Sequence, residues 1–278
     1  MERRDFARLV AIGGAGVLAP VLWPRRAAAP GRPTLSFQSG ADRVFSDSHG
    51  RLFDVAPAVQ RDAQFSPSQL ARSVNDAVAA ATLEDGRMAW VSKTSSQLTV
   101  LDRNGRVILR SSGYGSGLGQ LAAPSDVAGH GNSWIVADSH NHRLQIFSGR
   151  GRPTRTFGTL GHGLGQLNAP SSVAVAPDGS YHVAEAGNVR IQVFAPHGRS
   201  MGTYGNYGRK WGEMLSARCI RFDQTGHALV ADPVGGCVHI FDGRGRPVER
   251  IQTPNPGAHP HWLTPVAGAP TIVALSAA

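Results

Sequence analysis

A block of about 47 residues repeats along this 278-residue chain and constrains its fold more than any other feature. Glycines that open a Gly-Gln-Leu or Gly-Glu-Met segment lie 46 and 47 residues apart, at Gly119, Gly165 and Gly212. Glycines of a second motif keep the same period, at Gly105, Gly151, Gly198 and Gly245. A fixed period of roughly 40 to 50 residues indicates an array of supersecondary units that stack on one another.

Each repeat has the pattern of four short β-strands. In the third repeat the sequence predicts strands at residues 125–129, 133–138, 143–147 and 154–158, where apolar and β-branched residues recur. Pro177-Asp178-Gly179 and Asn104-Gly105 are typical of hairpin turns, because glycine adopts the positive φ that such turns require. The chain has 34 glycines and 18 prolines, which excludes a solenoid of helices. A four-stranded meander in each repeat predicts a β-propeller blade.

We therefore expect an all-β propeller over residues 30–278, built from six four-stranded blades of which the last is truncated. The first blade is predicted at about 33–65 and the second at about 76–112. Residues 260–263 and 272–274 resemble the first two strands of the sixth blade. The alternative is a five-bladed propeller, closed by pairing of the C-terminal strands with N-terminal ones.

Two repeats carry a family signature. Residues 135–147 read Ile-Val-Ala-Asp-Ser-His-Asn-His-Arg-Leu-Gln-Ile-Phe, and residues 183–194 read Val-Ala-Glu-Ala-Gly-Asn-Val-Arg-Ile-Gln-Val-Phe. Both segments follow a Gly-Leu-Gly-Gln-Leu sequence and resemble the NHL repeat, while residues 208–250 resemble it more loosely. The resemblance implies a rigid repeat-protein platform for protein binding.

Residues 1–29 resemble a twin-arginine export signal peptide. Arg3 and Arg4 precede Phe6, an apolar stretch runs from Leu9 to Trp23, and three alanines end the segment. The resemblance implies a periplasmic or otherwise extracytoplasmic protein. Pro30 follows the alanines and disfavours cleavage, and an uncleaved signal would tether the chain to the membrane.

The positive charge of the chain points to anionic partners. The formal net charge is +9, and beyond residue 29 it is +6, from 23 basic and 17 acidic residues. Export makes nucleic acid an improbable ligand and leaves a protein or an anionic envelope component as the expected partner. Arginines that recur after the third strand predict a basic rim for such a partner, although Gly-Arg turns are also ordinary solvated hairpins. These rim residues are Arg106, Arg152, Arg199 and Arg246.

A carboxylate ends the second strand of several blades, and an arginine follows four or five residues later. The second blade has Lys93 and Gln97 in the two places. We interpret the carboxylates as structural partners of the arginines that fix each hairpin, in preference to an acid–base or metal site. The predicted pairs are Asp47 with Arg51, Asp138 with Arg143, and Glu185 with Arg190.

One set of side chains has the composition of a metal site. Asp138, His140 and His142 share a loop, and His162 lies in the next link between blades on the same face. Carboxylate and imidazole groups bind Zn²⁺ and similar divalent cations. An Asn-His-Arg tract is also ordinary for this repeat and needs no metal. A divalent cation is therefore a possible cofactor that the sequence does not require, and the sequence suggests no other.

The two cysteines, Cys219 and Cys237, are predicted to remain free thiols. An intervening strand separates their own strands by roughly 9 to 10 Å, which exceeds the Cα separation of a disulfide. Cys237 stands at the repeat position that Arg143 and Arg190 hold in other blades.

The sequence favours a non-catalytic binding or scaffold module, monomeric and exported. The alternatives are a metal-dependent lyase or a redox-accessory propeller, because propellers similar to this one include a zinc-containing peptidyl-hydroxyglycine amidating lyase. Such lyases place histidines after the proline that starts several inner strands. A catalytic zinc needs about three protein ligands, but only one of the matching residues is a histidine. They are Thr34, Ser125, Ser171, Ala217 and His261.

Overall fold

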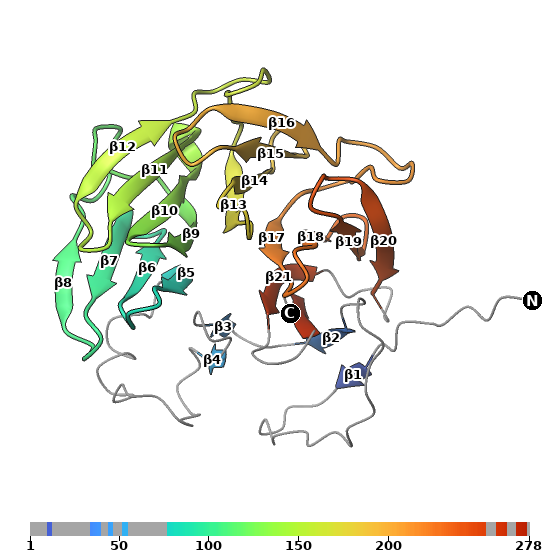
Figure 1. The fold of residues 1–278 in the computed structure, drawn as a ribbon, viewed down its shortest axis with the longest axis horizontal. Coiled ribbons are helices and arrows are strands. Elements are labelled where there is room, and N and C mark those ends of the chain that lie inside the picture. The colour runs from blue at the N-terminus through green and yellow to red at the C-terminus, as the bar shows by residue number, and fades with distance from the viewer. Residues whose placement is uncertain are drawn as a thin grey trace, which may run out of the picture.

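The computed structural model describes residues 10–12, 34–39, 44–46, 52–54, 77–253, 260–265 and 271–276. Their strands form six sheets, of which five have four strands and one has two. Figure 1 shows the sheets arranged around a common centre, with β5, β9, β13 and β17 toward the middle. The described part of the chain contains no helical segment with the length and hydropathy that crossing a membrane would need.

Four of the sheets are antiparallel meanders that follow one another along the chain. The first contains β5 (Ala77–Thr82), β6 (Met88–Ser92), β7 (Gln97–Leu101) and β8 (Val107–Arg110). The second contains β9 (Pro124–His130), β10 (Ser133–Asp138), the 3-10 turn η1 (Ser139–Asn141), β11 (Arg143–Ser148) and β12 (Pro153–Phe157). The third contains β13 (Pro170–Val175), β14 (Tyr181–Glu185), β15 (Arg190–Phe194) and β16 (Ser200–Tyr204). The fourth contains β17 (Cys219–Phe222), β18 (Ala228–Asp232), β19 (Cys237–Phe241) and β20 (Pro247–Gln252).

The strands near the two termini pair differently from the six-bladed prediction, and an N-terminal strand pairs with a C-terminal one, as the alternative expected. β2 (Thr34–Ser39) pairs in parallel with β22 (Thr271–Ser276), which pairs with β21 (Pro260–Pro265), whereas β3 (Val44–Ser46) and β4 (Leu52–Asp54) form a separate hairpin. The predicted first blade is therefore divided between two sheets. Without β2, β22 would expose a row of unpaired backbone groups, and this pairing satisfies them.

The N-terminal strand also joins this sheet. β1 (Val10–Ile12), which lies in the predicted export signal, pairs in parallel with β2. The export signal and the number of blades stay predictions.

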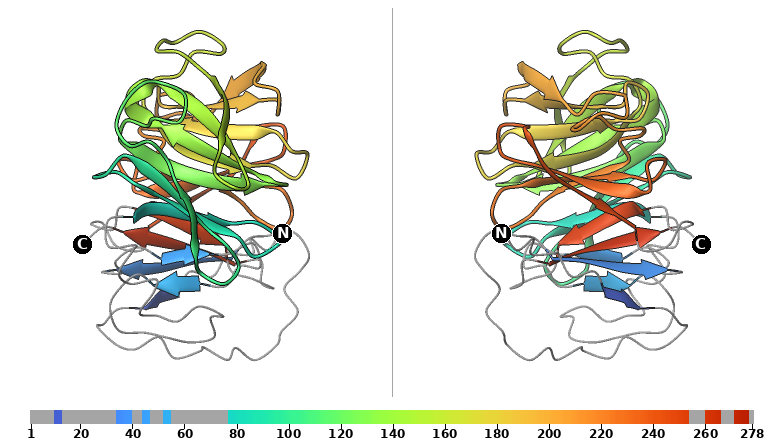
Figure 2. Two further views of the ribbon diagram at one scale, coloured as in Figure 1. Left: turned by 90° about the vertical axis from the view of Figure 1, so that its left-hand side faces the viewer. Right: turned by 90° about the vertical axis from the view of Figure 1, so that its right-hand side faces the viewer.

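The inner strands contact one another in sequence around the centre. β5 contacts β9, β9 contacts β13, β13 contacts β17, and β17 contacts β21. β3 contacts both β21 and β5. In the side views of Figure 2 the strands cross the molecule, and the loops that join them gather at its two sides. The loops on each side therefore form a distinct face.

The hydrophobic core lies between neighbouring sheets. Strand β10 contributes side chains to two of these core layers, one on each of its faces. Trp134 and Val136 pack toward the β5–β8 sheet, whereas Ile135 and Ala137 pack toward the β13–β16 sheet. Successive side chains of a strand point to opposite faces, so a strand buried on both faces must be apolar at every position. This explains the continuous apolar runs of the second strands, which contrast with the largely exposed outer strands.

His182 in β14 is a buried titratable group whose two ring nitrogens are both engaged. Nδ1 lies 2.9 Å from Tyr204 Oη and Nε2 lies 3.1 Å from Ser180 Oγ. Burial lowers the pKa of His182 to about 4 from its ordinary value of 6.5. His182 therefore takes up a proton below about pH 6.5 in the unfolded chain, but only below about pH 4 in the folded chain. The stability due to neutral His182 is present above pH 6.5 and is lost as the pH falls toward 4.

We expect the wild-type protein to lose about 2 kcal/mol more unfolding free energy between pH 7 and pH 4.5 than the variant His182→Gln. Urea unfolding at both pH values measures the difference. The exposed His197 gives the control, because His197→Gln should show the same loss as the wild type. Equal losses in the wild type and in His182→Gln would contradict the assigned role of His182.

Candidate functional site

Two of the predicted carboxylate–arginine pairs lie in the described residues, and the structure brings both together. Arg143 Nε donates to Asp138 Oδ2 over 2.7 Å, and Arg190 Nε donates to Glu185 Oε1 over 2.6 Å. Both carboxylates are fully buried. The third pair, Asp47 with Arg51, lies outside the described residues.

The arginine of each pair also holds the link that leads into its blade. The Arg143 guanidinium donates to the carbonyl oxygens of Ser116, Gly117 and Gln120 over 2.7 to 3.0 Å. Asp138 Oδ1 accepts the N–H of Ala122 over 2.7 Å at the end of the same link. The link is thereby fixed at several points, and the carboxylate is engaged in holding it.

In the predicted second blade, Lys93 and Gln97 were expected at the carboxylate and arginine positions, and the structure shifts the first of these by one residue. The strand register places Ser92, and not Lys93, opposite Gln97. Ser92 Oγ accepts hydrogen bonds from the N–H and the hydroxyl of Ser95. Lys93 is exposed at the start of the loop. The prediction was wrong because spacing alone does not fix strand register within one residue.

The predicted metal set is not gathered into one site. Asp138 is buried against Arg143, His140 and His162 are exposed, and His142 Nδ1 accepts the N–H of Ala169 over 3.0 Å. Among the described residues, a different group brings three potential ligand atoms within 4.8 Å of one another.

Three consecutive links expose large apolar side chains at two repeated positions each. The link at residues 111–123 turns back on the side chain of Gln120, whose Oε1 accepts the N–H of Gly117. Glycine is needed at position 115, because a Cβ added there would lie 2.3 Å from the same oxygen. The same folding recurs at residues 158–169 and 205–218. We call the exposed set the link surface. Its members are 56 to 78% exposed and comprise Tyr114, Leu118, Leu160, Leu164, Tyr207 and Trp211.

The links and the loops between second and third strands lie on one face. Asn141 Nδ2 donates to the carbonyl oxygen of Gly115, and Asn188 Nδ2 donates to that of Gly161. These loops comprise residues 93–96, 111–123, 139–142, 158–169, 186–189, 205–218 and 233–236, and they contain one acidic residue, Glu213. Exposed cations of the same loops are Lys93, Arg209, Lys210 and Arg218. The described loops around the link surface therefore carry a net positive charge.

The four arginines of the predicted basic rim are exposed, at the opposite ends of the strands from the links. Each accepts, through its carbonyl oxygen, a hydrogen bond that closes the turn between third and fourth strands. Two of these turns also contain an aspartate. Asp102 Oδ1 accepts the N–H of Arg106, and Asp242 Oδ1 accepts the N–H of Arg246. Carboxylates therefore partly offset the positive charge of the rim.

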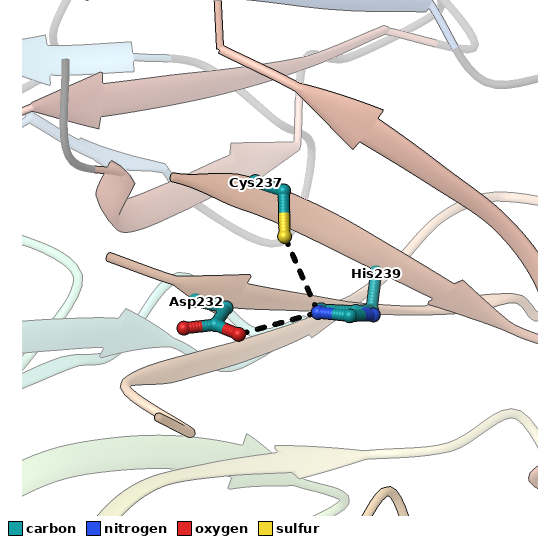
Figure 3. A group of neighbouring side chains, drawn as sticks. All are labelled: Asp232, Cys237 and His239. Atoms are coloured by element: carbon teal, nitrogen blue, oxygen red, sulfur yellow. Dashed lines mark hydrogen bonds and ion pairs between the residues drawn. The ribbon is translucent and has the colours of Figure 1, made fainter. Parts of the chain in front are cut away.

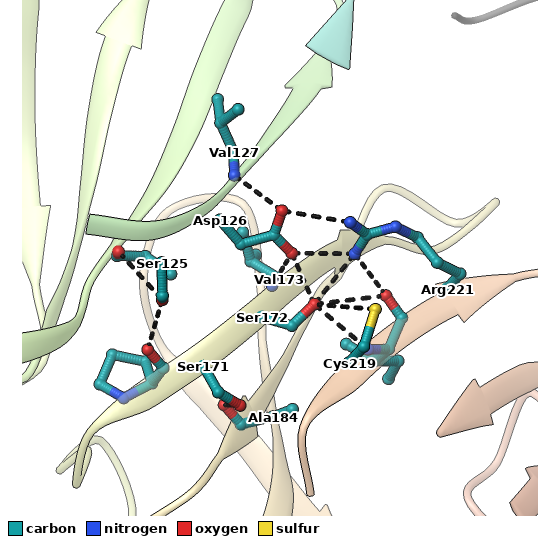
Figure 4. Close-up of polar contacts among 12 residues, drawn as sticks. Ser125, Asp126, Val127, Ser171, Ser172, Val173, Ala184, Cys219 and Arg221 are labelled. Atoms are coloured by element: carbon teal, nitrogen blue, oxygen red, sulfur yellow. Dashed lines mark hydrogen bonds and ion pairs between the residues drawn. The ribbon is translucent and has the colours of Figure 1, made fainter. Parts of the chain in front are cut away.

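A buried ion pair joins three inner strands near the centre, and sequence reasoning missed it. Asp126 of β9 accepts two hydrogen bonds from the Arg221 guanidinium of β17, over 2.8 and 3.2 Å (Figure 4). Ser172 Oγ and the N–H of Val173 donate to Oδ2 over 2.5 and 3.0 Å, and the N–H of Val127 donates to Oδ1. Burial lowers the pKa of Arg221, but the charge and hydrogen bonds of Asp126 raise it, so that the pKa lies above its ordinary value.

Two of the inner-strand positions compared with lyase histidines also join neighbouring blades. Ser125 Oγ donates to the carbonyl oxygen of Pro170 over 2.7 Å, and Ser171 Oγ donates to that of Ala217 over 2.8 Å. The hydroxyls therefore connect β9 to β13 and β13 to the residues that precede β17. These positions stabilise the ring of inner strands.

The remaining cluster combines a carboxylate, a thiol and an imidazole. Asp232, Cys237 and His239 are all buried, and Figure 3 shows their side chains converging between β18 and β19. Burial, together with the Asp232 carboxylate, raises the pKa of the Cys237 thiol to about 12. Both Cys237 and Cys219 are free thiols, as predicted. In the sequence, the feature that could have revealed this cluster is His239. It stands where the two preceding meanders have Gln145 and Gln192.

No family model matches this chain, and no curated protein sequence matches it. Its fold is similar to that of virginiamycin B lyase from Staphylococcus aureus, with a TM-score of 0.55 and 15% identity over 68% of this chain. It is also similar to the WD40 β-propeller domain of Doa1, with a TM-score of 0.50 and 17% identity over 64% of this chain.

The matches span 59% of the lyase chain and 54% of the Doa1 domain, less than two thirds of either. These likenesses show an all-β fold of the propeller type and repeat-protein character. They do not extend to activity or partners.

Proposed function

We propose that this protein is a non-catalytic binding module whose link surface docks an acidic, apolar segment of a partner protein. The observation that carries the proposal is the recurrence of two exposed apolar side chains in each of three links. Large exposed apolar sets rimmed by polar residues mark interaction sites. The proposed module is an exported NHL-type propeller, and the twin-arginine-like residues 3–6 support its location outside the cytoplasm.

The links suit binding because they are held in place before a partner arrives. Arg143 and Arg190 each donate to three carbonyl oxygens of a link, and Asp232 accepts the N–H groups of Leu215 and Ser216 in the third. A preorganised loop loses little conformational entropy on binding. Tyrosine and tryptophan are also the residues that most often dominate interface energies.

Charge selects the class of partner. Among the described loops of this face lie four exposed cations and a single acidic residue, Glu213, which already accepts the N–H of Lys210. An acidic segment is attracted to such a face, and a basic one is repelled. The apolar side chains favour a protein segment over a phosphate group or a polysaccharide, because they need apolar area to bury.

The centre of the molecule supports binding rather than catalysis. Asp126 accepts five hydrogen bonds, two of them from Arg221, so this carboxylate is engaged on every side. A general base needs a free lone pair within reach of a substrate proton. Asp126 and Arg221 thus join β9 to β17.

A panel of short synthetic peptides tests the proposal. We expect peptides that combine Glu and Asp with Leu and Phe to bind the wild-type protein, as measured by fluorescence polarisation. Copies with Lys at the acidic positions should bind at least about tenfold more weakly. Trp211→Ser and Leu164→Ser should each weaken binding about tenfold, since each removes more than 1 kcal/mol of apolar contact.

The matched control is Met201→Ser, which removes an apolar side chain of β16 that is exposed to the same degree as Leu118 but lies outside the links. This variant should bind as the wild type does. Equal binding of acidic and basic peptides, or unchanged binding by Trp211→Ser and Leu164→Ser, would overturn the proposal.

A further inference from the structure

The last antiparallel meander, β17–β20, departs from the preceding two at the hairpin between its second and third strands. In those two meanders the hairpin holds a carboxylate, an arginine and a glutamine, whereas here the arginine is Cys237 and the glutamine is His239. The substitutions remove the guanidinium that held the link and place a thiol and an imidazole beside the carboxylate of Asp232. The equivalent triplets are Asp138, Arg143, Gln145 and Glu185, Arg190, Gln192.

The three side chains converge on one point. His239 Nε2 lies 3.3 Å from Cys237 Sγ and 3.3 Å from Asp232 Oδ2 (Figure 3). Ligands of a tetrahedral Zn²⁺ ion lie about 2.0 Å (N, O) and 2.3 Å (S) from the metal, which places them roughly 3.3 to 3.6 Å from one another. The two separations from His239 match those of ligands that share a zinc ion, and all three ligand atoms lie within 4.8 Å of one another.

A catalytic triad would need a different arrangement of the same residues. In a triad the carboxylate binds one imidazole nitrogen and the nucleophile binds the other. Here both Asp232 and Cys237 face the same nitrogen, Nε2. The geometry is that of three donors around a common centre and excludes a relay through the ring.

The surroundings orient Asp232 for such a role. Its Oδ1 accepts the N–H and hydroxyl of Ser216 and the N–H of Gly235, over 2.7 to 3.0 Å. Its Oδ2 accepts the N–H of Leu215 and faces His239. Hydrogen bonds of this kind fix the orientation of metal-binding carboxylates.

We infer that Asp232, Cys237 and His239 form a Zn²⁺ site that holds the β18–β19 hairpin where the two preceding meanders use arginine and glutamine. Thiolate, imidazole and carboxylate together are a typical zinc donor set. The fourth position is left to water or to a ligand that accompanies the ion. The inference does not rest on the proposed peptide binding, although Asp232 also accepts the N–H groups of Leu215 and Ser216 in the third link.

Zinc binding to the full-length protein tests the inference. After refolding with Zn²⁺ and exhaustive dialysis, we expect about one zinc per chain by elemental analysis. Cys237→Ser and His239→Gln should each retain less than a tenth of it. Co²⁺ loading should give a thiolate-to-cobalt absorption band in the wild type that is absent from Cys237→Ser.

Two further variants separate metal binding from folding. Cys219→Ser changes the other buried thiol and should keep both the zinc and the cobalt band. The double variant Cys237→Arg/His239→Gln introduces the residues that the two preceding meanders have at these positions, so it should fold and bind no zinc. Wild-type protein without stoichiometric zinc, equal zinc loss in Cys219→Ser and Cys237→Ser, or wild-type zinc binding by the folded double variant would overturn the inference.

Discussion

Replacing Asp126 with alanine is expected to lower the free energy of unfolding by about 3 to 5 kcal/mol, since the change leaves a mostly buried guanidinium without its partner and two N–H groups without their acceptor. Arg221 would lose both of its hydrogen bonds to the carboxylate, and the N–H groups of Val127 and Val173 would lose their acceptor. The expected decrease in Tm is on the order of 10 °C for a chain of this size. Urea unfolding and thermal unfolding measure the effect.

A second substitution isolates the cause. In Asp126→Leu/Arg221→Met both charges are replaced by apolar side chains, which is often nearly neutral for a buried pair. We therefore expect the double variant to be more stable than Asp126→Ala. If the double variant is as unstable as the single one, the loss comes from packing and the ion pair is not its source.

Arg143→Ala is expected to cost about 3 to 5 kcal/mol for a related reason, because the fully buried Asp138 carboxylate would lose its charged partner. The effect should also have a local signature. The carbonyl oxygens of Ser116, Gly117 and Gln120 would lose their common donor, so amide hydrogen exchange should accelerate across residues 113–121.

The exposed Arg152 of the basic rim provides the control for this substitution. Arg152→Ala should change the unfolding free energy by less than about 0.5 kcal/mol, as surface substitutions usually do. Similar losses of unfolding free energy in Arg143→Ala and Arg152→Ala, or unchanged exchange in residues 113–121 of Arg143→Ala, would contradict the role assigned to Arg143.

Local chemistry explains why the middle of the fold was predictable. The strands predicted in the third repeat lie within one residue of β9 to β12 at every end, because each hairpin is encoded by its own turn residues. Gly105 has a φ of 79° and Gly179 a φ of 82°, as their turns require. The pairing of β2 with β22 joins segments far apart in the chain, so no local pattern specifies it, and the sequence offered pairing of the two ends only as an alternative.

The contacts of the candidate site divide in the same way, into local pairs that the sequence predicted and long-range pairs that it did not. Asp138 and Arg143 face each other across one hairpin, so their spacing predicted the pair. Asp126 and Arg221 are 95 residues apart, and they meet because β9 and β17 both pack against β13. The apolar residues of the links are visible in the sequence. Their exposure is not, because a repeated leucine or tyrosine is equally typical of a core position.

Amide hydrogen exchange with a bound acidic peptide tests the central claim most directly, since it reports which face of the molecule binds. The proposed function predicts protection in residues 113–121, 159–167 and 206–214, with unchanged exchange in the turns that carry Arg106, Arg152, Arg199 and Arg246. Protection confined to those arginine turns, with unchanged exchange in the three links, would contradict it.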